Sequence, residues 1–316
     1  MTDTLTQSAI APVSSTRYGA DFDGFSKALG ASFARYGFAV ISEHGLDQAK
    51  IDRANADAKA FFALPEAVKR RYKIEKAAGQ RGYTPFGIET AKGAEHFDLK
   101  EFWHVGRELP PDDPLRAYMP DNVWPSEVAG FKESESWLYD ALEGLGRKVL
   151  RAIARYLKLN DDYFESTVHN GNSVLRLLHY PPSDFAGPNI RAGAHEDINT
   201  ITLLLGAEEG GLQVKDRDGR WLPINPPAGS VVVNIGDMLQ RLTNHVLPST
   251  THRVVNPPEA RKGVARYSTP FFLHFRPDFL IQTLPGCISP ERPDRYPEPI
   301  TADGFLVERL KEIKLM

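Results

Sequence analysis

The feature that most constrains the fold is a histidine and an aspartate two residues apart, His195 and Asp197, at the head of an apolar run. Residues i and i+2 of an extended segment project to the same side, so these two side chains can converge on one point. An imidazole and a carboxylate aimed together supply two of the three ligands of the 2-His-1-carboxylate site that holds non-haem Fe(II). The third ligand must come from far along the chain, and His252 is the candidate.

A wider pattern surrounds this pair. Five residues occur in a set order along the chain: His195, Asp197, His252, Arg266 and Ser268. This set resembles the Fe(II)- and 2-oxoglutarate-dependent oxygenases, in the branch that includes isopenicillin N synthase. The stretches Gly210–Val214 and Asn234–Asp237 lie between the motifs and add to the likeness, which covers most of residues 9–280.

The resemblance implies a metal centre and a fold. His195, Asp197 and His252 would bind Fe(II) and leave open positions for a chelating keto acid and for O2. The fold would be mainly β with flanking helices (α+β), a distorted double-stranded β-helix or jelly roll. A closed structural zinc site normally has four ligands, often cysteines, and the chain has one cysteine, Cys287. A three-ligand catalytic zinc with a bound water stays an alternative.

The distal histidine has a rival in His245. That residue lies beside Asn244 in a segment that we expect to be a turn. His252 opens a segment that is similar to the start of the corresponding strand in the family. We therefore assign His252, not His245, as the third ligand.

The resemblance also implies a site for the cosubstrate. Arg266 and Ser268 would hold the distal carboxylate of 2-oxoglutarate, because a guanidinium grips a carboxylate through two parallel hydrogen bonds and the hydroxyl adds a third donor. A structural ion pair of Arg266 is the alternative. Tyr180 occupies the place of a tyrosine that donates to the same keto acid in many relatives. Leu178 stands where those relatives often have Asn, which puts a second polar contact in doubt.

Aromatic residues supply candidate substrate contacts. In relatives of this kind the segments 81–87 and 98–105 pass near the mouth of the active site, which makes Tyr83, Phe86 and Trp103 candidates. Phe272, on the strand that begins with Arg266, is a fourth. For each of the four, packing in the core is the alternative.

Hydrophobic periodicity outlines the chain. Apolar residues at helical spacing predict helices from Asp21, over 47–63, over 125–159 and near the C-terminus around Phe305–Ile313. Strands are predicted over 37–41, 98–105, 173–180, 230–235 and 266–275, and an ordered loop over 81–87. We divide the chain into an N-terminal region packed on the core (1–165), the jelly-roll core (166–280) and a C-terminal extension with a helix (281–316), all in one structural unit.

Composition limits the kinds of molecule that this protein can bind. A charged fraction of 25% with a net charge of −3 argues against nucleic acid as a partner. There is no apolar run long enough for a membrane span and no pattern of a secretory signal, and a single cysteine fits a reducing compartment. We therefore expect a cytoplasmic protein that acts on a small molecule, and a monomer is compatible with this composition.

The resemblance thus implies an enzyme that uses Fe(II), 2-oxoglutarate and O2 to hydroxylate or desaturate a small organic substrate, with formation of succinate and CO2. Two alternatives stay open. One is an iron oxidase of the same fold that uses no keto acid, because relatives of that kind also carry an Arg-x-Ser motif. The other is a non-catalytic protein that binds a small acid on this scaffold.

Overall fold

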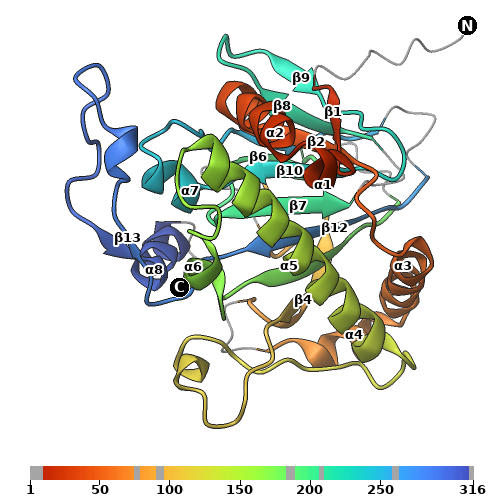
Figure 1. Ribbon diagram of the computed structural model, residues 1–316. Coiled ribbons are helices and arrows are strands. Elements are labelled where there is room, and N and C mark those ends of the chain that lie inside the picture. Colours follow the sequence, from red (N-terminus) through yellow and green to blue (C-terminus); the bar gives the residue numbers. More distant parts are fainter. Residues whose placement is uncertain are drawn as a thin grey trace, which may run out of the picture.

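Two β-sheets pack face to face, and long helices cover the outer face of the larger one (Figure 1). The computed structural model describes residues 10–74, 79–89, 96–182, 189–205, 210–257 and 263–312. Apolar residues of both sheets, among them Phe38, Val232, Val214 and Val254, form one buried cluster between the sheets. This packing is the jelly roll that the sequence predicts, so the fold class is confirmed.

The larger sheet has eight strands, and only its edge pair β1–β2 is parallel. Its spatial order is β1 (Pro12–Ser14), β2 (Phe38–Ser42), β10 (Val231–Ile235), β7 (Ile201–Leu205), β12 (Arg266–Leu273), β5 (Val174–Tyr180), β4 (Glu101–Gly106) and β3 (Gly82–Thr84). Strands β1 to β4 come from the N-terminal half of the chain and flank those of the C-terminal half. Both halves of the sequence therefore build one sheet.

The smaller sheet carries the predicted metal ligands. Its order is β6 (Ala192–His195), β11 (His252–Val254), β8 (Leu212–Lys215) and β9 (Trp221–Pro223). Strands β8 and β9 form a hairpin whose turn contains Gly219 with φ +81°, the left-handed conformation that glycine adopts without strain. A third, two-stranded sheet joins β13 (Leu280–Ile281) to β14 (Ile300–Thr301).

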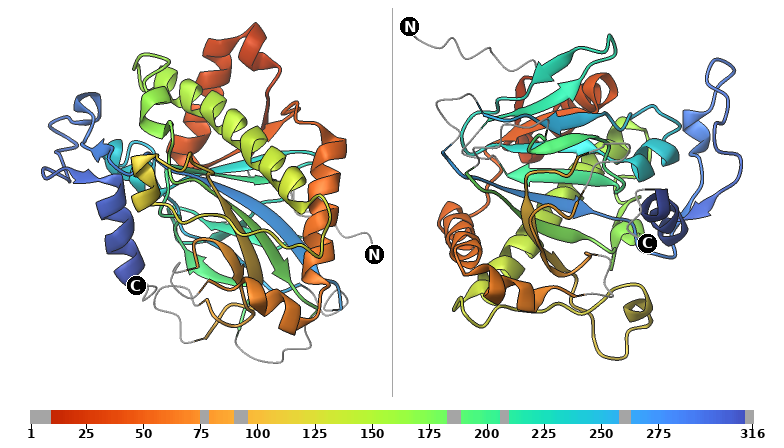
Figure 2. Two further views of the ribbon diagram at one scale, coloured as in Figure 1. Left: turned by 90° about the horizontal axis from the view of Figure 1, so that it is seen from below. Right: turned by 180° about the vertical axis from the view of Figure 1, so that it is seen from behind.

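Two of the long helices begin after a capping aspartate, Asp21 or Asp47. Helix α2 (Phe22–Tyr36) begins after Asp21, whose carboxylate accepts from the Gly24 N–H, and ends at Gly37 with φ 69°. Helix α5 (Phe131–Tyr156) runs across the outer face of the large sheet (Figure 2). The remaining helices are α1 (Arg17–Ala20), α3 (Gln48–Phe62), α4 (Glu66–Lys69), α6 (Glu165–Val168), α7 (Asp237–Leu242) and α8 (Ala302–Glu312).

Most predicted elements are present with shifted ends, as in β4 and β12, and two larger differences concern the helix over 125–159 and the loop over 81–87. The helix predicted over 125–159 begins only at Phe131, because Gly130 has φ +87° and interrupts the helical backbone. The prediction of a loop over 81–87 was wrong for Gly82–Thr84, which pair with β4 as a strand. Ile313, at the end of the predicted C-terminal helix, lies outside the described residues. Among the helices that the structure describes, none has the length and apolar character needed to cross a bilayer.

Two glycines of α5 test how tightly this helix packs on the sheet. At Gly146 an added Cβ would lie 2.5 Å from Leu273 Cδ1 and 3.2 Å from Leu203 Cδ1, both in fully buried side chains. At exposed Gly144 the same atom would meet nothing within 4 Å. Through helix propensity, Gly144→Ala should raise the free energy of unfolding by about 0.5–1 kcal/mol. Through overpacking, Gly146→Ala should lower it by about 1–3 kcal/mol. Urea unfolding measures both, and equal stabilisation by the two variants would contradict close packing of α5.

Candidate active site

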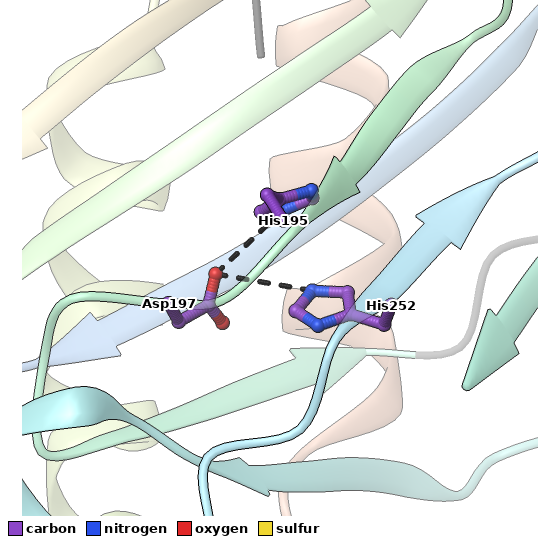
Figure 3. Close-up of side chains that lie close together, drawn as sticks. All are labelled: His195, Asp197 and His252. Carbon is purple, nitrogen blue, oxygen red and sulfur yellow. Dashed lines mark ion pairs between the residues drawn. The ribbon is translucent and has the colours of Figure 1, made fainter. Parts of the chain in front are cut away.

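Three side chains on or directly after strands of the smaller sheet point toward one another (Figure 3). His195 ends β6 and His252 begins β11, and the two residues are paired directly across these strands. Asp197 lies just beyond β6, with its Oδ1 3.7 Å from His195 Nε2 and 3.8 Å from His252 Nε2. One ligand atom from each of the three lies within 4.8 Å of the others. This arrangement could hold a metal ion on one face and leave the opposite face open.

The two imidazoles are oriented as metal ligands. His195 Nδ1 lies 2.7 Å from the Gly193 carbonyl oxygen, and His252 Nδ1 lies 3.1 Å from that of Thr250. A carbonyl only accepts, so each Nδ1 carries the proton and each Nε2 lone pair faces Asp197. Burial, with His252 as the second cause, lowers the pKa of His195 to about 4. The ring is therefore neutral at pH 7, the form that binds a metal.

The Asp197 carboxylate is held from its other side. Its Oδ2 accepts hydrogen bonds from Thr202 Oγ1 at 2.5 Å and from Asn234 Nδ2 at 2.8 Å, which leaves Oδ1 directed at the two histidines. Burial alone would raise the pKa of Asp197, but the two imidazoles and these hydrogen bonds lower it below its usual range. The carboxylate stays ionised, so the donor set of two neutral imidazoles and one anion fits a divalent metal ion.

Backbone contacts also hold the loop after β6. The Asp237 N–H donates to the Asp197 carbonyl at 2.7 Å, and the Gly236 N–H donates to the Thr200 carbonyl at 3.0 Å. A Cβ at Gly236 would lie 2.1 Å from the Asn199 carbonyl oxygen, so this position requires glycine. In the sequence, the stretch Asn234–Asp237 is recognisable only as part of the family likeness. Its physical role is to support the loop that carries Asp197.

His245 lies apart from these three residues. Its Nε2 is 2.6 Å from the Tyr296 hydroxyl, and the two rings are stacked. Within the described ranges, the group of potential ligands contains His195, Asp197 and His252 and not His245.

A second cluster of polar residues is buried on the larger sheet. Arg266 and Ser268 lie on β12 opposite Tyr180 and Leu178 of β5. The Arg266 guanidinium lies 5.1 Å from the centre of the Tyr180 ring, and Arg266, Ser268 and Tyr180 are all buried. Burial lowers the pKa of Arg266, although the neighbouring Tyr180 hydroxyl opposes this shift. A buried cation beside two hydroxyl donors could hold a carboxylate.

A cavity of about 440 Å³ is lined by His195 and Asp197, two of the three converging residues. One wall is polar: Arg176 Nε donates to His104 Nε2 at 2.5 Å, and Lys100 Nζ lies 2.8 Å from both Glu89 and Asp98 carboxylates. The Phe272 ring lies on the same wall, 5.2 Å from the Arg176 guanidinium carbon. The size fits a small organic molecule.

Of the four aromatic residues predicted to contact substrate, the structure places Phe272 in the cavity lining. Tyr83 and Trp103 are 1% and 0% exposed and pack on Phe61 instead, and Phe86 packs on Phe97. The reason for Trp103 is strand alternation, since neighbouring residues of β4 face opposite sides.

Several lining residues were not predicted from the sequence. They are His104, Arg176, Glu89, Lys100 and Asp98. His104 is next to Trp103 on β4 and faces the cavity. The one sequence signal for this wall was Arg176, a charged residue within an apolar strand, which has to find partners.

Comparisons with known proteins agree with this geometry. The family profile of the 2OG-Fe(II) oxygenase superfamily matches residues 171–275, and that of "non-haem dioxygenase in morphine synthesis N-terminal" matches residues 11–127. The 2-oxoglutarate-Fe(II) type oxidoreductase hxnY of Emericella nidulans is 34% identical over 281 residues, which cover 85% of this chain and 79% of that protein.

Two similar crystal structures cover nearly the whole chain. A 2OG-Fe(II) oxygenase family protein from Caulobacter crescentus is 66% identical, with a TM-score of 0.92, over 97% of this chain and 99% of that one. A Neurospora crassa protein in complex with alpha-KG (2-oxoglutarate) and thymine is 30% identical, with a TM-score of 0.85, over 96% of each chain. This chain therefore belongs to the 2OG-Fe(II) oxygenase superfamily, whose members use Fe(II), 2-oxoglutarate and O2.

Proposed function

We propose that this Fe(II)- and 2-oxoglutarate-dependent dioxygenase oxidises a small polar molecule in the cavity beside His195, Asp197 and His252. The observation that carries the proposal is that His195, Asp197 and His252 converge, and that His195 and Asp197 line a cavity of about 440 Å³. The reaction would convert 2-oxoglutarate to succinate and CO2 as the substrate is hydroxylated or desaturated.

In this proposal His195, Asp197 and His252 bind Fe(II). Their protonation states support it, because both Nε2 atoms and Asp197 Oδ1 offer lone pairs to the same point. Bound Fe(II) would supply the activation of O2 needed to oxidise a C–H bond. The protein's part is to hold the ligands, orient the substrate and exclude water.

Arg266, Ser268 and Tyr180 are proposed to hold the distal carboxylate of 2-oxoglutarate. Their burial on adjacent strands supports this role, because charge-assisted hydrogen bonds are stronger away from water. The comparisons favour 2-oxoglutarate over an oxidase without a keto acid, since the similar proteins are named as 2-oxoglutarate-dependent. The complete set of potential metal ligands argues against a non-catalytic binding protein.

The polar wall indicates the kind of substrate. Arg176 lines the cavity beside the Phe272 ring and has further N–H groups, whereas both ring nitrogens of His104 are engaged by Arg176 and the Gly79 carbonyl. A donor beside an aromatic ring suits a small planar molecule with polar edges. The similar Neurospora crassa protein has been crystallised with thymine, so thymine is the first compound to test here. A net charge of −3 supports a free small molecule and not nucleic acid as the substrate.

Metal titration tests the ligand assignment. We expect the apoprotein to bind one Fe(II) per chain, and His195→Ala or Asp197→Ala to abolish turnover because each removes a ligand. His252→Ala should lose iron affinity. His245→Ala is the matched control and should bind iron like wild type, since His245 contacts Tyr296 instead. Loss of iron in the His245 variant with retention in the His252 variant would overturn the assignment.

The cosubstrate site is tested by Arg266→Gln. Each charge-assisted hydrogen bond is worth about 1.5–3 kcal/mol, so the loss of one should weaken 2-oxoglutarate roughly 10- to 150-fold. Iron affinity should stay unchanged. The affinity is measured from the absorption band of the Fe(II) chelate without oxygen. If wild type forms no such band with 2-oxoglutarate, the protein does not use this keto acid.

Phe272→Ala tests the substrate side of the cavity. Burial of a phenylalanine side chain against an apolar surface contributes about 1.5–3 kcal/mol. Loss of the ring should therefore raise the KM of the substrate about tenfold or more, while the affinity for 2-oxoglutarate stays unchanged. Succinate formation in a screen that begins with thymine identifies the substrate and gives its KM. Phe86→Ala is the control and should behave like wild type, because Phe86 does not line the cavity. An effect of Phe86→Ala as large as that of Phe272→Ala would contradict this placement.

A further inference from the structure

We propose that Arg191 is a second cationic residue for the distal carboxylate of 2-oxoglutarate and acts together with Arg266. The proposal rests on the proposed function and adds a residue to the same site. Arg191 lies four residues before the candidate ligand His195, in the segment that leads into β6. It therefore directly precedes the strand that carries His195, and its contact with Val264 brings it close to the start of β12.

The Arg191 side chain is buried, and none of the described residues provides it with a counter-ion. The residue is 4% exposed, and its Nη2 donates to the Val264 carbonyl oxygen over a long 3.3 Å. Among the residues that the structure describes, its buried Nη1 has no hydrogen-bond partner, and no carboxylate acts on the charge of Arg191. A buried cation in this condition is costly unless an anion binds beside it.

Arg191 and Arg266 lie around the same aromatic ring. The guanidinium carbon of Arg191 lies 5.9 Å from the centre of the Tyr180 ring, and that of Arg266 lies 5.1 Å from it. Burial, and next to it the positive charge of Arg266, lowers the pKa of Arg191. The two like charges oppose each other, so an anion bound beside both would relieve their repulsion.

A carboxylate is the anion that best fits this pair. Its two oxygens can accept from two guanidinium forks at once, and Ser268 and Tyr180 supply further donors on the neighbouring strands. Leu178, opposite Ser268, has no polar group to offer. Arg191 would provide, from the segment before β6, the additional polar contact that β5 lacks at that position.

Keto-acid binding to the Arg191→Gln protein tests the proposal. The Fe(II) chelate band is titrated without oxygen, once with 2-oxoglutarate and once with 2-oxobutyrate, which lacks the distal carboxylate. We expect 2-oxoglutarate to bind about tenfold or more weakly than to wild type, with 2-oxobutyrate unchanged. Arg220→Gln, which removes an exposed arginine, is the matched control and should leave both affinities unchanged.

The outcomes separate this inference from the proposed function. If Arg191→Gln binds 2-oxoglutarate like wild type while Arg266→Gln binds it weakly, Arg191 has no part in the site and the proposed function stands. An equal loss for both keto acids would show general damage and would also overturn the role of Arg191. Absence of the chelate band in wild type would instead count against the proposed function. If Arg191→Gln does not fold, Arg191→Lys keeps the charge without the fork and should show the same selective loss; unchanged 2-oxoglutarate binding there overturns the proposal.

Discussion

The Asp197 carboxylate is the group on which the candidate metal centre depends. Its Oδ2 is fixed by Thr202 at the start of β7 and by Asn234 of β10, both strands of the larger sheet. Its Oδ1 faces His195 and His252 of the smaller sheet. One side chain thus joins the two sheets of the jelly roll at the candidate active site. A shift between the sheets would separate the three ligand atoms, so the packing of the core and the geometry of the site are coupled.

Two groups of buried charged residues near this centre differ in how their cations are paired. On the cavity side, Lys100 and Arg176 lie beside the Glu89 carboxylate. Their attraction to this carboxylate offsets the cost of removing the charges from water. At the cluster of Arg191 and Arg266 around Tyr180, two buried guanidinium groups lie together, and Arg191 has no carboxylate partner among the described residues. The carboxylates and cations of the first arrangement pair within the protein, whereas we propose that the second receives an anion. This difference separates the proposed substrate wall from the proposed cosubstrate site.

Much of the fold follows from local sequence patterns. The apolar spacing of α2, its Asp21 cap and its Gly37 terminus define that helix without reference to the remainder of the chain. The β-branched run of β10 likewise identifies a buried strand. Strand β3 was not predicted. Its three residues, Gly82–Thr84, form a strand because they pair with β4, and their own sequence contains no pattern that indicates this pairing.

The sequence by itself determined the family, the ordered set of potential ligands and the preference for His252 over His245, because these depend on residue type and order. Only the tertiary structure decided which side each residue faces. Trp103 and His104 are neighbours on β4, yet one is in the core and the other lines the cavity, since side chains alternate along a strand. Arg191 could not be distinguished from other arginines until the fold placed it, buried, beside Tyr180 and Arg266. The sequence gives the charge of a side chain. Its partners depend on which strands lie side by side in the folded protein.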